Sequence, residues 1–469
     1  MERTEDRRSS SERGRRRAPW ISIAALAALT LSACTGVAGG QATTRSSPPP
    51  ATAEQIPQPS VPTGVEVAPL SERVDLMTPT FSHPTDITNP LFPVSRQASV
   101  LMLGHVEGKP FRTEVTLLPE TRIVRWESQD VETAVSQYVA FLDGRIEEVA
   151  YDLYAQSDDG SVWYFGEDVF DFRDGAIVVT EGTWLAGRDG PAAMIMPADP
   201  QVGDVYRTEN APGFVFEEVT VRSTSQTLDG PLGPIPGGML AEELHMDGAT
   251  EDKTFAPGYG EFFTSGGGDV EALALAVPTN GSDQAVPEEL TTIADQALSV
   301  DEAAGKGDWH SATAAFDRIR STWSSYRSGD VPRLIGPWMD RAIARLEGAI
   351  DARLAGRARH EAIEVARSSF DLQLRFRPVP EIDLARMDLW AAQLLIDEAV
   401  GDDAGAAADA FALDYVRDRI RTSLDDSTLA EVNTELGAIQ IAVVDEDPAA
   451  AAEQAEALRG TLRDGGLVS

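Results

Sequence analysis

Two acidic residues follow a run of aromatic residues in the middle of the chain. In the segment Trp163-Tyr164-Phe165-Gly166-Glu167-Asp168 the glycine ends the aromatic run, and Asp171 follows shortly after. We expect the strand to end at Gly166, with Glu167 and Asp168 beyond it. Carboxylates in that position can act as a general acid and base, or coordinate a hard cation. A hydrolase that uses Glu167 with Asp168 or Asp171 is therefore one candidate.

The aromatic side chains of this region indicate a second kind of site. An aromatic surface beside carboxylates can bind a sugar or another amphipathic ligand. The candidate ligand-binding residues are Trp163, Tyr164, Glu167, Trp184 and Met196. In the alternative interpretation, strand alternation points Trp163 into a core and leaves Tyr164 and the acidic residues in solvent.

A histidine and a glutamate near the C-terminus offer a third kind of chemistry. His360 and Glu364 are four residues apart, so they would share one face of a helix. Facing helices of a bundle can build a divalent-metal site from such pairs. The alternative is an exposed histidine among Arg357, Arg359 and Glu361.

Motifs that would identify an enzyme are missing from the sequence. It contains no nucleophile elbow, no glycine-rich phosphate loop and no zinc-protease helix. Gly266-Gly267-Gly268 lacks the strand and helix that would cradle phosphate, so it predicts a loop. We therefore predict no cofactor, and we favour non-catalytic binding of a small molecule or a surface partner.

Several motifs flank the aromatic segment, between residues 83 and 264. They are Asn89-Pro90-Leu91-Phe92-Pro93, Gly182-Thr183-Trp184, Met194-Ile195-Met196-Pro197-Ala198 and Pro257-Gly258-Tyr259-Gly260. Together with the Trp-Tyr-Phe-Gly-Glu core they resemble a group of uncharacterised, actinobacterial-type secreted proteins and lipoproteins. Leu91 departs from the aromatic residue of the group's opening motif. The resemblance implies a β-rich fold and supports the domain limits, and it lends no function.

Cys34 is the only cysteine of the chain, and its sequence context predicts the cellular location of the protein. It closes the run Leu31-Ser32-Ala33-Cys34, after a short apolar segment (20–31) that follows a cluster of arginines. This arrangement resembles the lipobox of bacterial lipoproteins. The resemblance implies a signal peptide at 1–33, acylation of Cys34 with palmitate, and a lipid anchor at the extracytoplasmic face of the bacterial cell membrane. The alternative is a short membrane anchor.

The chain is strongly acidic, with 76 Asp and Glu against 39 Lys and Arg and a formal net charge of -37. Such a field repels phosphate backbones, so we expect no nucleic-acid partner. The expected partners are the lipid bilayer, through acylated Cys34, and an unknown small molecule or surface partner. A solvated acidic surface is the simplest explanation of the charge.

Residues 34–75 are rich in Pro, Ser and Thr and predict a disordered tether. Residues 76–277 predict an antiparallel β-rich domain. Six Asp-Gly pairs between residues 143 and 248 supply the positive φ angles that tight hairpins need, and the runs between them are β-branched and aromatic. We expect a β-meander that curves as a half-barrel or forms a sandwich.

Residues 286–467 predict an all-α bundle of seven or eight helices. Leu334, Trp338, Ala342, Leu346 and Ile350 recur every four residues and form one apolar stripe. Similar sequences after Gly307-Asp308 and Gly401-Asp402 predict an internal duplication, with chance similarity of alanine-rich helices as the alternative. The sequence thus predicts an α+β multidomain protein.

Overall fold

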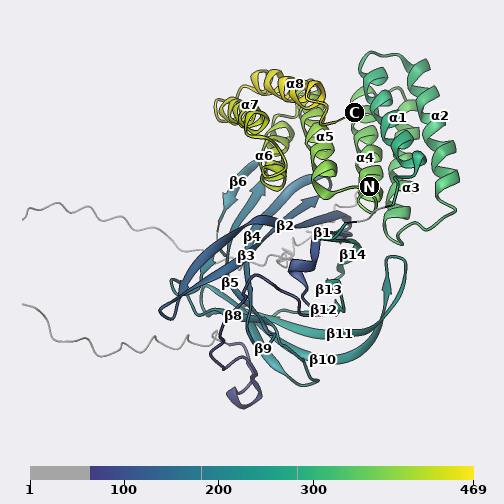
Figure 1. Cartoon of the computed structure of the whole chain (residues 1–469). Helices are drawn as coiled ribbons and strands as arrows, with labels where there is room; N and C mark the ends of the chain where they lie inside the picture. The colour runs from purple at the N-terminus through teal and green to yellow at the C-terminus, as the bar shows by residue number, and fades with distance from the viewer. Residues whose placement is uncertain (1–63, 181, 282–283, 469) are drawn as a thin grey trace, which may run out of the picture.

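The computed structural model describes residues 64–180, 182–281 and 284–468. Strands come first and helices follow (Figure 1). The strands are β1 (Gln97–Val106), β2 (Lys109–Trp126), β3 (Gln129–Leu142), β4 (Arg145–Gln156), β5 (Val162–Arg173), β6 (Ala176–Val179), β7 (Trp184–Leu185), β8 (Ala193–Met196), β9 (Val205–Ala211), β10 (Val215–Gly230), β11 (Gly233–His245), β12 (Thr250–Ala256), β13 (Gly260–Gly266) and β14 (Asp269–Pro278). The helices are α1 (Glu288–Gly305), α2 (Trp309–Tyr326), α3 (Ile335–Asp351), α4 (Ala355–Gln373), α5 (Val379–Val400), α6 (Asp403–Ile420), α7 (Asp426–Val444) and α8 (Pro448–Asp464). This order confirms the predicted α+β architecture.

The predicted anchor lies outside this range. Cys34, the signal peptide 1–33 and most of the tether 34–75 are not among the described residues. Within the described ranges, no helix is long and apolar enough to cross a membrane.

All fourteen strands belong to one antiparallel sheet. Its order is β6-β5-β4-β3-β2-β1-β14-β13-β12-β11-β10-β9, and β7 and β8 pair with β5. The pairing of β1 with β14 joins the first and last strands of the region. Because β8 contacts β9, the two ends of the sheet approach each other, and the sheet curves around an interior. Of the two shapes that the sequence left open, a half-barrel and a sandwich, the half-barrel is therefore closer to the observed sheet.

Tight turns and bulges set this curvature. Asp143 and Gly144 have φ values of 52° and 81°, and Asp174 and Gly175 have 52° and 74°. These are the left-handed angles of two-residue hairpin turns, as the sequence predicts. Register shifts interrupt several strand pairs, such as that of β2 with β3 between Leu117 and Thr121, and such bulges bend a sheet.

The helices pack against the outer face of strands β1 to β6 and β14, whereas most of strands β9 to β12 lies away from the bundle (Figure 1). Leu101 of β1 and Leu275 of β14 share one hydrophobic core with helices α1 to α5. Phe141 of β3 and Phe172 of β5 share another with helices α5 to α8, where Phe141 stacks on Trp390 at a centroid distance of 5.1 Å. The sequence left open whether the two parts touch. They are packed against each other through continuous apolar cores.

The helices fall into two groups of four with the same order of contacts. In the first group α1 contacts α2 and α4, and α3 contacts both α2 and α4; helices α5 to α8 repeat this pattern. The turns correspond as well, since Gly307 and Gly401 have φ values of 70° and 77°, and Arg353 and Glu446 have 52° and 55°. A duplication would produce this correspondence, and it remains a prediction.

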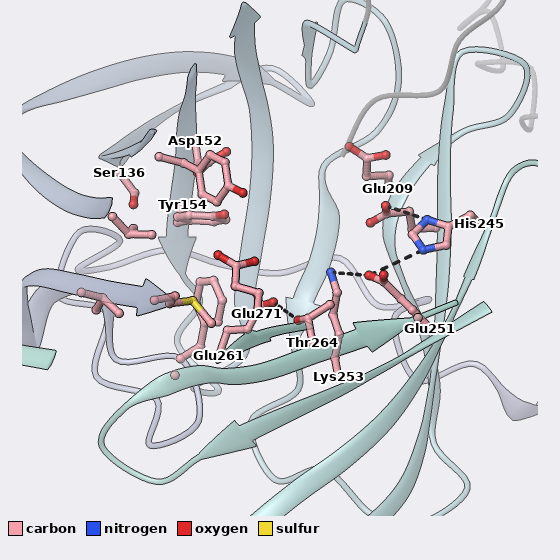
Figure 2. Close-up of a pocket in the computed structure, with 18 of the residues that line it drawn as sticks. Ser136, Asp152, Tyr154, Glu209, His245, Glu251, Lys253, Glu261, Thr264 and Glu271 are labelled. Atoms are coloured by element: carbon pink, nitrogen blue, oxygen red, sulfur yellow. Dashed lines mark hydrogen bonds and ion pairs between the residues drawn. The ribbon is translucent and has the colours of Figure 1, made fainter. Parts of the chain in front are cut away.

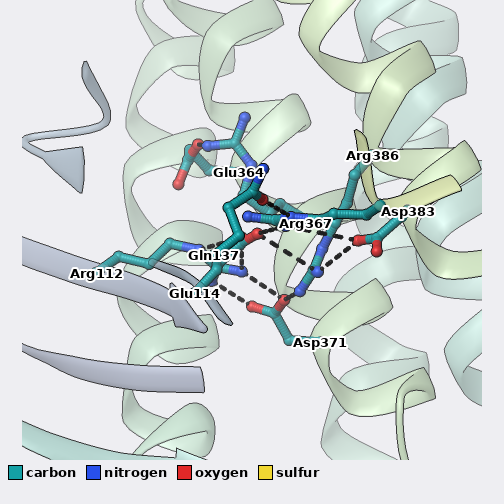
Figure 3. A network of polar contacts seen from close by, with 9 residues as sticks. Arg112, Glu114, Gln137, Glu364, Arg367, Asp371, Asp383 and Arg386 are labelled. Atoms are coloured by element: carbon teal, nitrogen blue, oxygen red, sulfur yellow. Dashed lines mark hydrogen bonds and ion pairs between the residues drawn. The ribbon is translucent and has the colours of Figure 1, made fainter. Parts of the chain in front are cut away.

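A buried network of ion pairs joins the sheet to the helices (Figure 3). From β2, Arg112 contacts Asp371 of α4 at 2.6 Å, and Glu114 contacts Arg419 of α6 at 2.6 Å. Arg386 of α5 contacts Asp371 at 2.9 Å. Burial alone would raise the pKa of Glu114, but the surrounding arginines hold it well below its usual range. The network therefore pairs charges that water does not reach.

Removal of one arginine from this network is expected to destabilise the fold strongly. Arg386→Met leaves Asp371 and Asp383 as buried charges that have lost a partner, so we expect a loss of about 3–5 kcal/mol in the free energy of unfolding. Arg96→Met removes an exposed pair with Asp86 and should cost no more than about 1 kcal/mol. Urea unfolding followed by circular dichroism measures both, and equal effects would contradict the prediction.

Candidate functional site

A cavity of about 640 Å³ lies inside the curve of the sheet. Strands β1 to β4 and β9 to β14 line it, together with the segment 92–94 before β1. Figure 2 shows many of the lining side chains. One part of the wall is apolar and includes Phe92, Val94, Val100, Met102, Val115 and Phe216. The remainder is rich in acidic side chains, so the lining is amphipathic.

Strand alternation brings these side chains to the interior. On β2, Glu114 faces the helices while Val115 lines the cavity. On β3, Gln137 accepts a hydrogen bond from Arg419 of the bundle, while Ser136 and Tyr138 line the cavity. Because helices cover one face and the cavity occupies the other, neither face of these strands is an ordinary solvated surface.

The lining contains seven carboxylates and two basic side chains. The carboxylates are Asp152, Glu209, Glu217, Asp247, Glu251, Glu261 and Glu271, and the basic residues are His245 and Lys253. Figure 2 shows Asp152 and Tyr154 on one side, His245 and Glu251 on the other, and Glu271 between them.

Both basic residues are held in ion pairs on one wall. Lys253 Nζ lies 2.6 Å from Oε2 of Glu243 and 3.4 Å from Oε1 of Glu251. His245 Nδ1 lies 3.2 Å from Oε1 of Glu217, and its Nε2 lies 3.6 Å from Oε1 of Glu251. Burial opposes the charge of His245, but Glu217 and Glu251 raise its pKa to about 11. This wall is therefore a compact set of paired charges.

The same wall contains a group that could hold a metal ion. Ligand atoms of Glu217, Glu243 and His245 lie within 4.8 Å of one another, and among the described residues this is the one such group of three or more. Binding would require His245 to lose the proton that Glu217 and Glu251 stabilise, and Lys253 already contacts Glu243. The wall therefore favours its internal ion pairs over a metal.

The other carboxylates of the lining have no basic partner of this kind. Asp152 accepts a hydrogen bond of 2.8 Å from the Tyr164 hydroxyl, and burial raises its pKa to about 7. Burial and the charge of Glu261 raise the pKa of Glu271 to about 7. Oε1 of Glu209 and Oε1 of Glu271 are buried without a hydrogen bond of good geometry, although Trp184 and Glu167 approach Glu209 and Thr113 approaches Glu271. Bound protons, in place of a basic partner, reduce the charge on Asp152, Glu209 and Glu271.

The three predicted catalytic carboxylates do not converge. Strand β5 continues through Gly166, whose φ of 123° accompanies a register shift that places Glu167 opposite Asp152. Glu167 is buried, whereas Asp168 points to the other face and contacts Arg122 at 2.6 Å. Asp171 lies opposite Glu148. It is four steps along the strand from Glu167, a distance of about 13 Å.

The glycine is needed at this bulge. A Cβ atom at Gly166 would lie 2.2 Å from the backbone oxygen of Trp184, because β7 pairs closely with β5 here. The expectation that the strand ends at Gly166 is therefore corrected. Burial, together with the charges of Glu209 and Asp152, raises the pKa of Glu167 well above its usual range.

The five predicted ligand-binding residues form a core beside the cavity and do not line it. Trp163, Tyr164, Trp184 and Met196 are all buried in one hydrophobic cluster, and Glu167 is buried next to it. Trp163 Nε1 donates to Oγ of Ser161 at 2.9 Å. The alternative in which Tyr164 faces solvent is also wrong, because its ring is buried between contacts with Tyr154 and Trp184. Of the five residues, Tyr164 supports Asp152 directly, through the hydrogen bond from its hydroxyl.

His360 and Glu364 lie on α4 as expected, but each has another partner. His360 Nδ1 is 2.9 Å from Nε2 of Gln393, and Arg367 donates to Glu364 at 2.7 Å. Burial alone would raise the pKa of Glu364, but the charges of Arg367 and His360 lower it. They are not part of the three-ligand group found among the described residues.

Sequence reasoning missed the interior carboxylates. The one sequence feature that could have indicated them is the spacing of two residues between Glu243 and His245, and between Glu251 and Lys253. This spacing places both members of each pair on one face of a strand. A strand with one solvated face gives the same pattern, so alternation alone does not identify an interior site.

Comparison of the sequence with models of protein families found no match, and neither did a search of curated proteins. The resemblance to secreted proteins and lipoproteins therefore remains a prediction.

The interior carboxylates predict that the protein is more stable at mildly acidic pH. Asp152 and Glu271 have ordinary pKa values of 3.8 and 4.5, and both rise to about 7 in the folded chain. A carboxyl group with a raised pKa binds its proton more tightly when folded, so its stabilisation is present below the ordinary pKa and is lost as pH rises through about 7. The melting temperature should therefore fall between about pH 5 and about pH 8.

The double variant Asp152→Asn and Glu271→Gln tests the origin of this effect. It should flatten the pH dependence of the melting temperature, while Glu453→Gln, at an exposed position on α8, should leave it unchanged. Differential scanning calorimetry provides the measurement. An identical slope in the double variant would show that other groups cause the effect.

Proposed function

We propose that this chain is a lipid-anchored protein of the extracytoplasmic face of the bacterial cell membrane that binds a small molecule, without catalysis, inside its curved sheet. The observation that carries the proposal is the cavity of about 640 Å³ with its amphipathic lining. Ligand sites in proteins commonly measure about 300–1,000 Å³ and combine apolar walls with a few polar groups.

The apolar part of the wall supports binding of an organic molecule. Val100 and Met102 of β1, and Val115 of β2, line the cavity together with Phe92. Burial of a ligand surface against such side chains stabilises a complex by about 25 cal/mol per Å² of apolar area, before the costs of association are subtracted. The polar wall then selects among ligands of similar size.

Two features support binding over catalysis. The histidine of the lining is held between Glu217 and Glu251 with its pKa raised to about 11, so it does not serve as a base near neutral pH. The carboxylates that the hydrolase alternative requires, Glu167 with Asp168 or Asp171, lie on opposite faces or far apart along β5.

The sequence supports the anchor. A basic leader, a short apolar run and the Leu31-Ser32-Ala33-Cys34 sequence precede a region rich in Pro, Ser and Thr. Each methylene of an acyl chain that enters the bilayer stabilises the bound state by about 0.8 kcal/mol, so two chains give stable anchoring. The cavity would then be held outside the cell on a tether.

A neutral fluorescent probe, N-phenylnaphthylamine, tests whether the cavity takes up small molecules. We use the full chain with Cys34→Ala and expect saturable fluorescence enhancement. Val115→Trp places an indole in the cavity and should weaken binding at least about tenfold, a loss of about 1.4 kcal/mol. Val400→Trp, at an exposed position at the end of α5, is the matched control. No saturable binding by the parent chain would contradict the proposed function.

Metabolic labelling with palmitate tests the anchor separately. The unsubstituted chain should carry label and sediment with membranes, whereas Cys34→Ala should carry none and be released. A chain recovered unlabelled, with its leader intact, would contradict this part of the proposal.

A further inference from the structure

We infer that the ligand of the cavity is a small organic cation, an amine on an apolar body, whose ammonium group replaces protons on the interior carboxylates. This inference rests on the proposed function and specifies its ligand class.

The first support is the imbalance of charge around the cavity. Seven carboxylates and two basic side chains line it, and both basic side chains contact Glu251 on one wall. Asp152, Glu209 and Glu271 lie outside this paired group. An anionic ligand would meet these carboxylates at close range in a poorly solvated space, so the lining excludes anions.

The second support is a pair of buried carboxyl groups that are incompletely hydrogen-bonded. Oε1 of Glu209 and Oε1 of Glu271 have no hydrogen bond of good geometry, although both side chains are more than nine-tenths buried. Trp184 and Glu167 approach the Glu209 carboxyl group, and Thr113 approaches that of Glu271. Buried acceptors normally have a partner, and an unmade hydrogen bond is costly. An ammonium group offers donors and a positive charge together, and so matches what these acceptors lack.

The third support is the aromatic and apolar wall. The Tyr154 ring is held by a stacked contact with Tyr164, at a centroid distance of 4.9 Å, and by an edge contact with Phe92 at 5.0 Å. A fixed aromatic ring next to carboxylates is a common surface for an ammonium group. Val100 and Met102 contact the apolar body. A bare metal ion gains nothing from these groups, and a space of about 640 Å³ far exceeds its size.

Exchange with protons follows from the surroundings of the two carboxylates. Burial raises the pKa of Asp152 and of Glu271 to about 7, and a bound cation would lower both values. The titratable groups that act on Asp152 are Tyr164, Tyr154, Glu167, Glu148 and Glu261, and those that act on Glu271 are Glu261, Lys253, Glu251, Tyr138 and Glu148. Cation binding should therefore release protons and strengthen as pH rises.

Three six-carbon probes with different charges test the ligand class: hexylammonium, hexanol and hexanoate. Isothermal titration of the full chain with Cys34→Ala at about pH 8 should give hexylammonium an affinity at least about tenfold above that of hexanol, with hexanoate weakest. Between about pH 8 and about pH 6 the hexylammonium affinity should fall about tenfold for each proton released, whereas that of hexanol should stay constant.

Variants at the two carboxylates test the contacts. Asp152→Asn and Glu271→Gln should each weaken hexylammonium about tenfold or more and leave hexanol within about twofold, because only the cation uses the charge. Glu453→Gln, on the exposed surface of α8, should change neither. Unfolding curves establish that each variant is folded.

The remaining outcomes separate the two proposals. If hexanol binds as tightly as hexylammonium, the cation inference is overturned while the cavity remains a binding site. If Zn²⁺ or Ca²⁺ binds and hexylammonium does not, the group Glu217, Glu243 and His245 is a metal site and the inference is also overturned. If neither the probes nor N-phenylnaphthylamine binds, the proposed function itself fails.

Discussion

The structure depends on how carboxylates are kept out of water on both faces of a single sheet. Helices cover the outer face of strands β1 to β6 and β14, and a cavity lies against the inner face, so several charged residues on these strands are buried. The chain has 76 acidic residues and only 39 lysines and arginines. The carboxylates that are buried on the two faces of the sheet are compensated by different means.

On the outer face, arginines supply the compensation. Glu114 of β2 and Asp371 of α4 are buried among Arg112, Arg386 and Arg419, which hold the pKa of both acids below the ordinary range. These contacts bridge residues that are hundreds of positions apart in sequence. They add specific pairing to apolar cores that already join strands and helices, and so define how the bundle sits on the sheet.

On the inner face, bound protons compensate much of the charge on the buried carboxyl groups. Lys253 and His245 form ion pairs within one wall, and Asp152, Glu209 and Glu271 have raised pKa values. Buried carboxyl groups with raised pKa values hold protons in the folded chain. A cation that enters the cavity can take the place of these protons. The aromatic core around Trp163 and Trp184 includes Tyr154, which lines the cavity, and Tyr164, whose hydroxyl donates to Asp152.

Local sequence determined much of the fold. The Asp143-Gly144 and Asp174-Gly175 pairs specify hairpin turns through their own backbone angles, and the four-residue periodicity from Leu334 to Ile350 specifies a helix, because both effects act within a few residues. Only the tertiary structure decided the site. The bulge at Gly166, imposed by the close approach of Trp184, turned Glu167 inward and away from Asp168. Strands distant in sequence gathered Asp152, Glu209 and Glu271 around one space, and their pKa values depend on burial, which no short segment encodes.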